Sequence, residues 1–85
     1  MAIKSEKIIG SKIINEIDSS MLVRTEYDTI TNNLIVIFPG EVCYEYNNVP
    51  WSIYTKFRMS ESQGSFFNKE IAKKYDYKKV IKEES

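Results

Sequence analysis

The sequence contains no histidine and one cysteine, Cys43, among its 85 residues. Without histidine, a zinc site would need carboxylates and one thiol, so we expect no metal and no cofactor. A general base near neutral pH would have to be a shifted carboxylate or lysine, and no closely spaced carboxylate pair is present. Cys43 lies in a predicted strand beside Glu45, with no basic neighbour to activate its thiol. We therefore expect a protein that is not an enzyme.

Long apolar runs are also missing, since none reaches the length of a signal-peptide core or a membrane span. We expect a cytoplasmic protein that has no membrane partner. With 42% hydrophobic and 28% charged residues, the composition is that of one small globular domain. Such a short chain depends on a few large side chains for its core, or on a partner.

The net charge is zero, with twelve basic and twelve acidic side chains, but its distribution is uneven. Residues 1–50 hold four basic and seven acidic side chains, whereas residues 51–85 hold eight basic and five acidic ones. This asymmetry predicts a basic side on the molecule. The alternative is that lysine is simply a common solvated residue of the predicted helices.

Three segments have the pattern of antiparallel strands: Met21–Tyr27, Leu34–Phe38 and Glu41–Tyr46. The first alternates, the second is a β-branched apolar run, and the third places Val42, Tyr44 and Tyr46 on one face. Turn-forming residues separate them, including Pro39-Gly40. We therefore predict a three-stranded antiparallel β-meander, with or without an added N-terminal strand.

The period changes to that of helices after Asn48. Trp51, Tyr54 and Phe57 recur at helical spacing and predict a helix from about Pro50 to Met59. A second helix, capped by Ser60 or Ser62, is expected through FFNKEIAKKY, and the last ten residues are expected to fray. The predicted fold class is α+β, with two short α-helices packed on one face of the sheet.

The Ile-rich N-terminus, residues 1–16, suits either a strand or a segment that covers the sheet. Leu34–Phe38 presents apolar side chains to both faces, so the second face needs a cover. That cover is either the N-terminal segment, which we favour, or another subunit. We divide the chain into this segment, a domain over residues 17–77, and a charged tail over residues 78–85.

A set of small motifs in a fixed order resembles the KTSC domain, a family named for a C-terminal extension of certain lysyl-tRNA synthetases. The residues that carry the resemblance are Ser19-Ser20, Tyr27-Asp28, Leu34-x-Val36-x-Phe38, Gly40, Tyr44-x-Tyr46, Val49-Pro50, Tyr54, Ser62-x-Gly64-x-Phe66-Phe67-Asn68, Ile71 and Tyr75. Stand-alone members of the family are small bacterial and phage proteins. The attachment to a synthetase implies RNA binding, by association rather than by mechanism.

Two groups of residues are candidates for contact with RNA or single-stranded nucleic acid. Tyr44, Tyr46 and Trp51 are aromatic side chains that suit base stacking, although their alternative role is to pack under the helices. The segment Ser60–Lys69 suits a phosphate, through Ser62, Gly64, Ser65 and Asn68, with Arg58, Lys69 and Lys73 flanking it. Plain helix capping and tight helix packing are the alternative for this segment.

A rival interpretation is a protein-interaction or assembly module. The predicted strand Leu34–Phe38 has apolar side chains on both faces, the net charge is zero, and the predicted sheet has a free edge. These features suit a homodimer, or a bacterial or phage regulator that binds a host protein. The sequence leaves both interpretations open.

Overall fold

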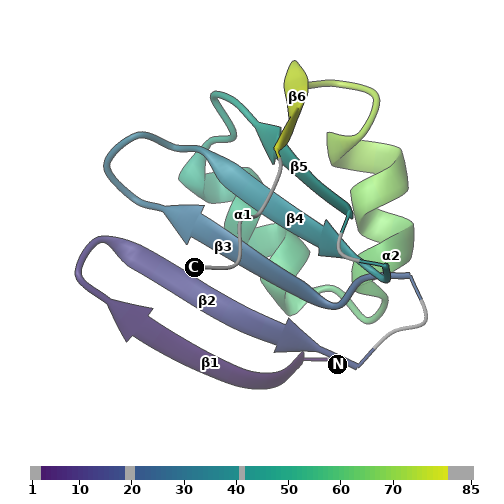
Figure 1. The fold of residues 1–85 in the computed structure, drawn as a ribbon, viewed down its shortest axis with the longest axis horizontal. Coiled ribbons are helices and arrows are strands. Elements are labelled where there is room, and N and C mark those ends of the chain that lie inside the picture. Colours follow the sequence, from purple (N-terminus) through teal and green to yellow (C-terminus); the bar gives the residue numbers. More distant parts are fainter. Residues whose placement is uncertain (1–2, 19–20, 41, 81–85) are drawn as a thin grey trace.

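The computed structural model describes residues 3–18, 21–40 and 42–80. Six strands form one antiparallel sheet in which each strand pairs with the next along the chain (Figure 1). The strands are β1 (Ile3–Ile9), β2 (Lys12–Ile17), β3 (Arg24–Asp28), β4 (Leu34–Phe38), β5 (Val42–Tyr46) and β6 (Tyr77–Val80). The α+β class and the central meander β3–β5 are confirmed, but the prediction of three strands understates the sheet.

The N-terminal segment adds two strands to the edge of the sheet. β1 and β2 form a hairpin whose turn contains Gly10 at φ 61°, a conformation that glycine adopts without strain. In β2 the side chains of Ile13, Asn15 and Ile17 alternate with exposed or half-buried neighbours and are buried beneath the helices. Residues 3–16 thus extend the sheet and do not lie across its second face.

The end of the chain also joins the sheet. We predicted that the last ten residues fray, which is wrong for β6, because Tyr77–Val80 pairs antiparallel with β5. Tyr77 lies opposite Tyr46, and Val80 lies opposite Cys43. The remainder of the predicted tail, residues 81–85, lies outside the described residues, as does Glu41 of the predicted third strand.

Two short helices pack on one face of the sheet, as predicted (Figure 1). Helix α1 (Trp51–Met59) begins after Pro50 and buries Tyr54 and Phe57. Helix α2 (Gln63–Phe66) has Ser62 as its N-cap and continues into the π-turn η1 (Phe67–Ile71), in which the Ala72 N–H donates to the Phe67 carbonyl oxygen. The second predicted helix is therefore a four-residue α-helix that continues as a π-helical turn, whose backbone is wider than that of an α-helix.

The core lies between the helices and the sheet, and two stacked tyrosines form its centre. The rings of Tyr27 and Tyr54 are nearly parallel, at 7°, with centroids 4.3 Å apart. The hydroxyl of Tyr27 donates to the carbonyl oxygen of Val49 at 2.7 Å and accepts from the side-chain amide of Asn32 at 2.8 Å. A buried hydroxyl needs hydrogen-bond partners, and here the partners are Asn32 in the turn before β4 and Val49 just before α1. The two bonds therefore hold both segments against the core.

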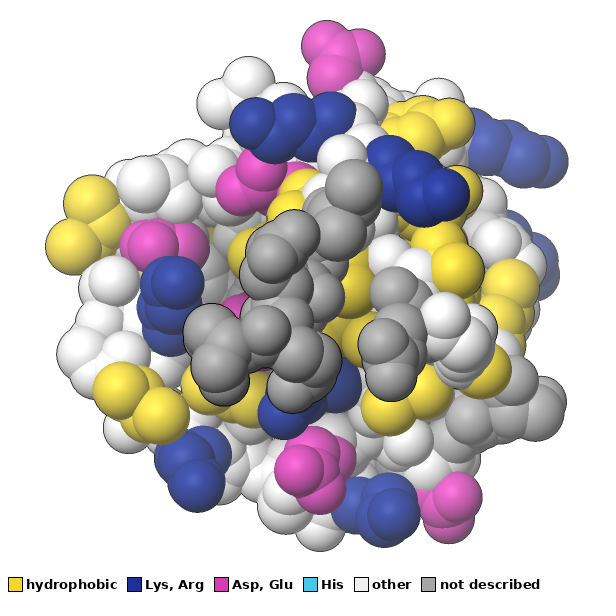
Figure 2. All heavy atoms as spheres, in the orientation of Figure 1, with side chains coloured by type: hydrophobic (Ala, Val, Ile, Leu, Met, Phe, Trp, Pro, Cys, Tyr) yellow, Lys and Arg dark blue, Asp and Glu magenta, His cyan; other side chains and the backbone are white. Residues whose placement is uncertain are grey.

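The opposite face of the sheet mixes apolar side chains with charges of both signs (Figure 2). The register places Ile35 and Ile37 of β4 on this face, between Glu26 and Arg24 of β3 on one side and Glu45 and Cys43 of β5 on the other. Ile37 and Cys43 are nevertheless buried. We call this surface the open face, because neither α1 nor α2 lies on it (Figure 1).

Candidate nucleic-acid interface

Tyr46, one of the two tyrosines expected to form a stacking platform, belongs to the core. Only 4% of it is exposed, and its ring meets Phe67 of η1 edge to face, with centroids 5.3 Å apart. Burial, with smaller contributions from the neighbouring Tyr77 and Tyr44, raises the pKa of its hydroxyl to about 12. The alternative that we weighed for Tyr46, packing beneath a helix, is what the structure shows.

Tyr44 is half-buried and meets Tyr77, a residue that the sequence did not single out. Their rings meet edge to face at 73°, with centroids 5.2 Å apart, and Tyr77 is 55% exposed. Lys79 lies directly opposite Tyr44 in the β5–β6 register and is exposed. We call Tyr44, Tyr77 and Lys79 the tyrosine rim. The sequence YKKV carries no alternation of apolar and polar residues that would have indicated the rim.

Trp51 does not join this rim. It is 51% exposed at the start of α1 and packs on Tyr27 and Tyr54, with centroids 6.1 Å and 5.7 Å away. Tyr27 belongs to β3, whereas the rim lies on β5 and β6, so a strand separates the two aromatic surfaces.

The second predicted region forms a shallow hollow between the end of α1 and the helix that follows. We call it the serine groove; its volume is about 220 Å³ and its lining residues are Ser60, Glu61, Ser62, Ser65, Phe66, Lys69 and Glu70. Ser62 caps α2 by accepting from the Ser65 N–H at 3.3 Å. Three predicted residues, Ser62, Ser65 and Lys69, therefore meet in one hollow, and the predicted capping role of Ser62 is present in the same place.

The other predicted residues of this region lie outside the groove. Gly64 is buried, and a Cβ there would lie 2.8 Å from the Met21 sulfur, so its small size serves close packing against the segment before β3. The Asn68 amide is exposed and reaches the same sulfur at 3.7 Å. The Arg58 guanidinium bonds both carboxylate oxygens of Glu6 on β1, at 2.5 Å and 2.9 Å.

Several lysines gather beside the groove, which supports a basic helical side. The Lys74 ammonium lies 2.9 Å from a carboxylate oxygen of Glu70. That hydrogen bond lowers the pKa of Glu70, and the charges of Lys74, Lys56 and Lys69 lower it further. We call Lys56, Lys69 and Lys74 the lysine cluster. Lys73 is exposed on the same turn as Lys74. The sequence analysis did not identify Lys56, because it lies on α1, thirteen residues before Lys69 in the chain.

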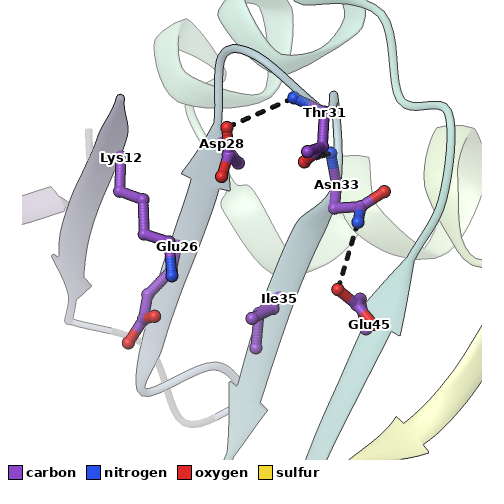
Figure 3. Close-up of a pocket in the computed structure, with 7 residues that line it drawn as sticks. All are labelled: Lys12, Glu26, Asp28, Thr31, Asn33, Ile35 and Glu45. Carbon is purple, nitrogen blue, oxygen red and sulfur yellow. Dashed lines mark hydrogen bonds between the residues drawn. The ribbon is translucent and has the colours of Figure 1, made fainter. Parts of the chain in front are cut away.

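A second hollow, of about 150 Å³, lies on the open face (Figure 3). It is lined by Lys12, Glu26, Asp28, Thr31, Asn33, Ile35 and Glu45. The carboxylates here have protein partners: Asp28 accepts from the N–H groups of Ile30 and Thr31, Glu45 from the Asn33 amide, and Glu26 lies 3.8 Å from Arg24. Among the described residues, no group of three or more His, Cys, Asp or Glu side chains is arranged to hold a metal ion.

In the described part of the chain, no helix combines the length and apolar character that crossing a membrane requires.

Comparisons with known proteins agree with the motif order. None of the curated proteins matches this sequence. The model of the KTSC domain matches residues 18–75, which span β3 to η1 and leave the β1–β2 hairpin and β6 outside. As the resemblance predicted, the chain belongs to the KTSC domain family.

Proposed function

We propose that this protein is a non-enzymatic module that binds single-stranded nucleic acid, RNA in particular. In this proposal the tyrosine rim stacks bases, and the lysines of the helical side hold the phosphates. One observation carries it: the half-exposed Tyr77 ring is fixed against Tyr44 with an exposed ammonium group, Lys79, beside them. Proteins that bind single strands combine such aromatic faces with a cationic track for the backbone.

The rim is held in place by the core beneath it. Phe38 meets Tyr44 edge to face with centroids 5.6 Å apart, and Tyr46 lies 5.2 Å from Tyr77. Rings that are already fixed lose little rotamer entropy when a base stacks on them. Cross-strand neighbours have Cβ atoms about 5 Å apart, so Lys79 is within reach of a phosphate next to a base on Tyr44.

The zero net charge sets a limit on affinity. Sequence-independent binding rises with the number of phosphates neutralised, and each contact to a single strand adds about 0.7 to the slope of log affinity against log salt. Four to five exposed lysines on the helical side and the rim correspond to a slope of about 3. Affinity is therefore moderate and falls as salt is added.

Fluorescence anisotropy with short labelled RNA oligomers across a salt series tests the proposal. Tyr77→Ala is expected to weaken binding about five- to hundredfold, since a stacked base contributes about 1 to 3 kcal/mol. Trp51→Ala is the matched control, because it removes another half-exposed ring, which packs on Tyr27 of β3 and is separated from the rim by β4. Lys79→Ala is expected to reduce the salt slope, whereas Lys7→Ala on β1 leaves it unchanged. The proposal fails if the wild-type protein shows no salt-dependent binding at low salt, or if Tyr77→Ala binds like wild type.

A second candidate function, a protein-interaction or assembly module, is favoured by strand β1. This seven-residue strand ends the described sheet, and its side chains Ile8 and Ile9 are 66% and 57% exposed, one on each face. An exposed edge with apolar side chains is a template for pairing with another chain. Sedimentation equilibrium tests self-association: a dimer that Ile9→Lys disrupts supports it, and a strict monomer at every concentration contradicts it.

A further inference from the structure

We infer that the serine groove is a phosphate subsite of the proposed nucleic-acid interface, and that Glu70 occupies its lysine cluster as an internal competitor in the free protein. This inference rests on the proposed function and adds a form of regulation to it. The ligand is a phosphate group, either of an RNA backbone or free in solution.

The groove and the lysine cluster share Lys69. Lys69 and Glu70 line the hollow, Lys74 bonds Glu70 at 2.9 Å, and the charge of Lys56 on α1 helps to lower the pKa of that carboxyl. One ammonium group, that of Lys74, thus pairs with the Glu70 carboxylate, and two further lysine charges, those of Lys56 and Lys69, act on it. An arrangement that holds a carboxylate in this way also suits a phosphate, which has more acceptor oxygens and a delocalised charge.

The other side of the groove supplies hydroxyl groups beside a second carboxylate, that of Glu61. Ser60, Ser62 and Ser65 line it with hydroxyl groups, and the half-buried Phe66 offers an apolar edge. The Ser65 hydroxyl is exposed, whereas the Ser60 and Ser62 oxygens already accept backbone hydrogen bonds. The Ser60 hydroxyl already donates its proton to the Ser62 carbonyl oxygen at 2.9 Å. Serine hydroxyls donate as well as accept, so Ser62 and Ser65 are the two that can offer a proton to a phosphate oxygen.

Glu70 opposes an incoming anion by its charge and by its position. The ion pair that holds it is easily exchanged, because the side chains of Lys74 and Glu70 are 59% and 40% exposed and such surface pairs contribute little. A phosphate can therefore take the place of the Glu70 carboxylate beside Lys74. Repulsion between Glu70 and the phosphate is the cost of that exchange.

The test compares Glu70→Gln with Glu16→Gln. Both variants remove one negative charge from a solvent-accessible side chain, but Glu16 lies on β2 on the open face, opposite Arg24, so it reports the effect of net charge away from the groove. Removing a like charge close to the phosphate in water is expected to raise RNA affinity about three- to fivefold. Glu16→Gln is expected to change it by less than about twofold, because charges farther apart than the screening length interact weakly. Lys74→Gln is expected to lower it.

Two titrations separate this inference from the proposed function. In the first, RNA binding is measured by anisotropy for the three variants; in the second, inorganic phosphate is added while the backbone amides of residues 62–69 are followed by NMR. Tighter binding of phosphate to Glu70→Gln than to Glu16→Gln, with shifts confined to the groove, supports the subsite even if RNA does not bind the rim. Equal affinities of both variants for both probes overturn the inference, even if Tyr77→Ala still weakens RNA binding. Circular dichroism confirms that each variant is folded.

Discussion

The substitution Tyr54→Phe tests whether a buried polar contact joins the N-terminal hairpin to the rest of the fold. The Tyr54 hydroxyl donates to the side-chain oxygen of Asn15 at 2.5 Å, and both residues are fully buried. The Asn15 amide donates in turn to Glu6 on β1 at 2.8 Å. Burial raises the pKa of the Tyr54 hydroxyl, so it stays protonated and remains a donor at neutral pH.

The expected cost follows from what the variant leaves behind. Phenylalanine keeps the ring and its stacking on Tyr27, so the main change is that the Asn15 oxygen loses its donor. A buried acceptor without a partner costs about 1 to 3 kcal/mol. In a domain of this size, each kcal/mol lowers the melting temperature by about 4 to 8 °C. We therefore expect a fall of at least about 4 °C.

Urea and thermal unfolding, followed by circular dichroism, measure the loss. Tyr77→Phe is the matched control, since its ring is 55% exposed and surface changes usually stay within about 0.5 kcal/mol. The double variant Asn15→Leu/Tyr54→Phe removes both partners and is expected to cost less than the sum of the single variants. A Tyr54→Phe protein as stable as Tyr77→Phe would show that the bond from Tyr54 to Asn15 does not stabilise the fold.

Two further stability predictions concern contacts between distant segments. The hydrogen bond from Arg58 holds the pKa of Glu6 below its ordinary value of 4.5, so this pair stabilises the fold above that pH and the contribution is lost as pH falls through the lowered pKa. Glu6→Gln is expected to lower the free energy of unfolding by under about 1 kcal/mol near neutral pH. In urea titrations, the free energies of wild type and variant should converge as the pH falls, and a difference that stays constant with pH would contradict this. The buried Gln63 amide donates to the carbonyl oxygens of Phe57 at 3.2 Å and Ser60 at 2.9 Å, so Gln63→Ala is expected to cost about 1 to 3 kcal/mol in thermal unfolding. Gln63→Glu should cost more, because its carboxylate would face those oxygens. Equal stability of the two variants would argue against the role of the Gln63 amide as a donor to the carbonyl oxygens at the end of α1.

Local patterns in the sequence were sufficient for the middle of the fold. The alternation in β3 and β5 and the apolar run of β4 placed three strands in the correct order, and helical spacing placed α1 to within a residue. Such elements are predictable because their period is set by neighbours in the chain. The order of small motifs also indicated the family that the domain comparison then showed.

The outer strands were harder to predict for a physical reason. β1 and β6 have few buried side chains, since β1 is exposed along nearly its whole length and β6 is exposed except for Val80. An edge strand is held mainly by backbone pairing with its neighbour, which leaves little pattern in its own residues. The same lack of pattern hid Tyr77 and Lys79.

Local sequence patterns were enough to predict the fold class, the central meander, the first helix, the family and the uneven distribution of charge. Only the tertiary structure decided which side chains share a surface. Pairing of β5 with β6 brings Tyr77 to Tyr44, the fold brings Lys56 of α1 close enough to Glu70 for its charge to lower the pKa of that carboxyl, and burial leaves only 4% of Tyr46 exposed. These partners are many residues apart in the chain, so no local period links them. Their proximity depends on competition among all the apolar faces for one small core.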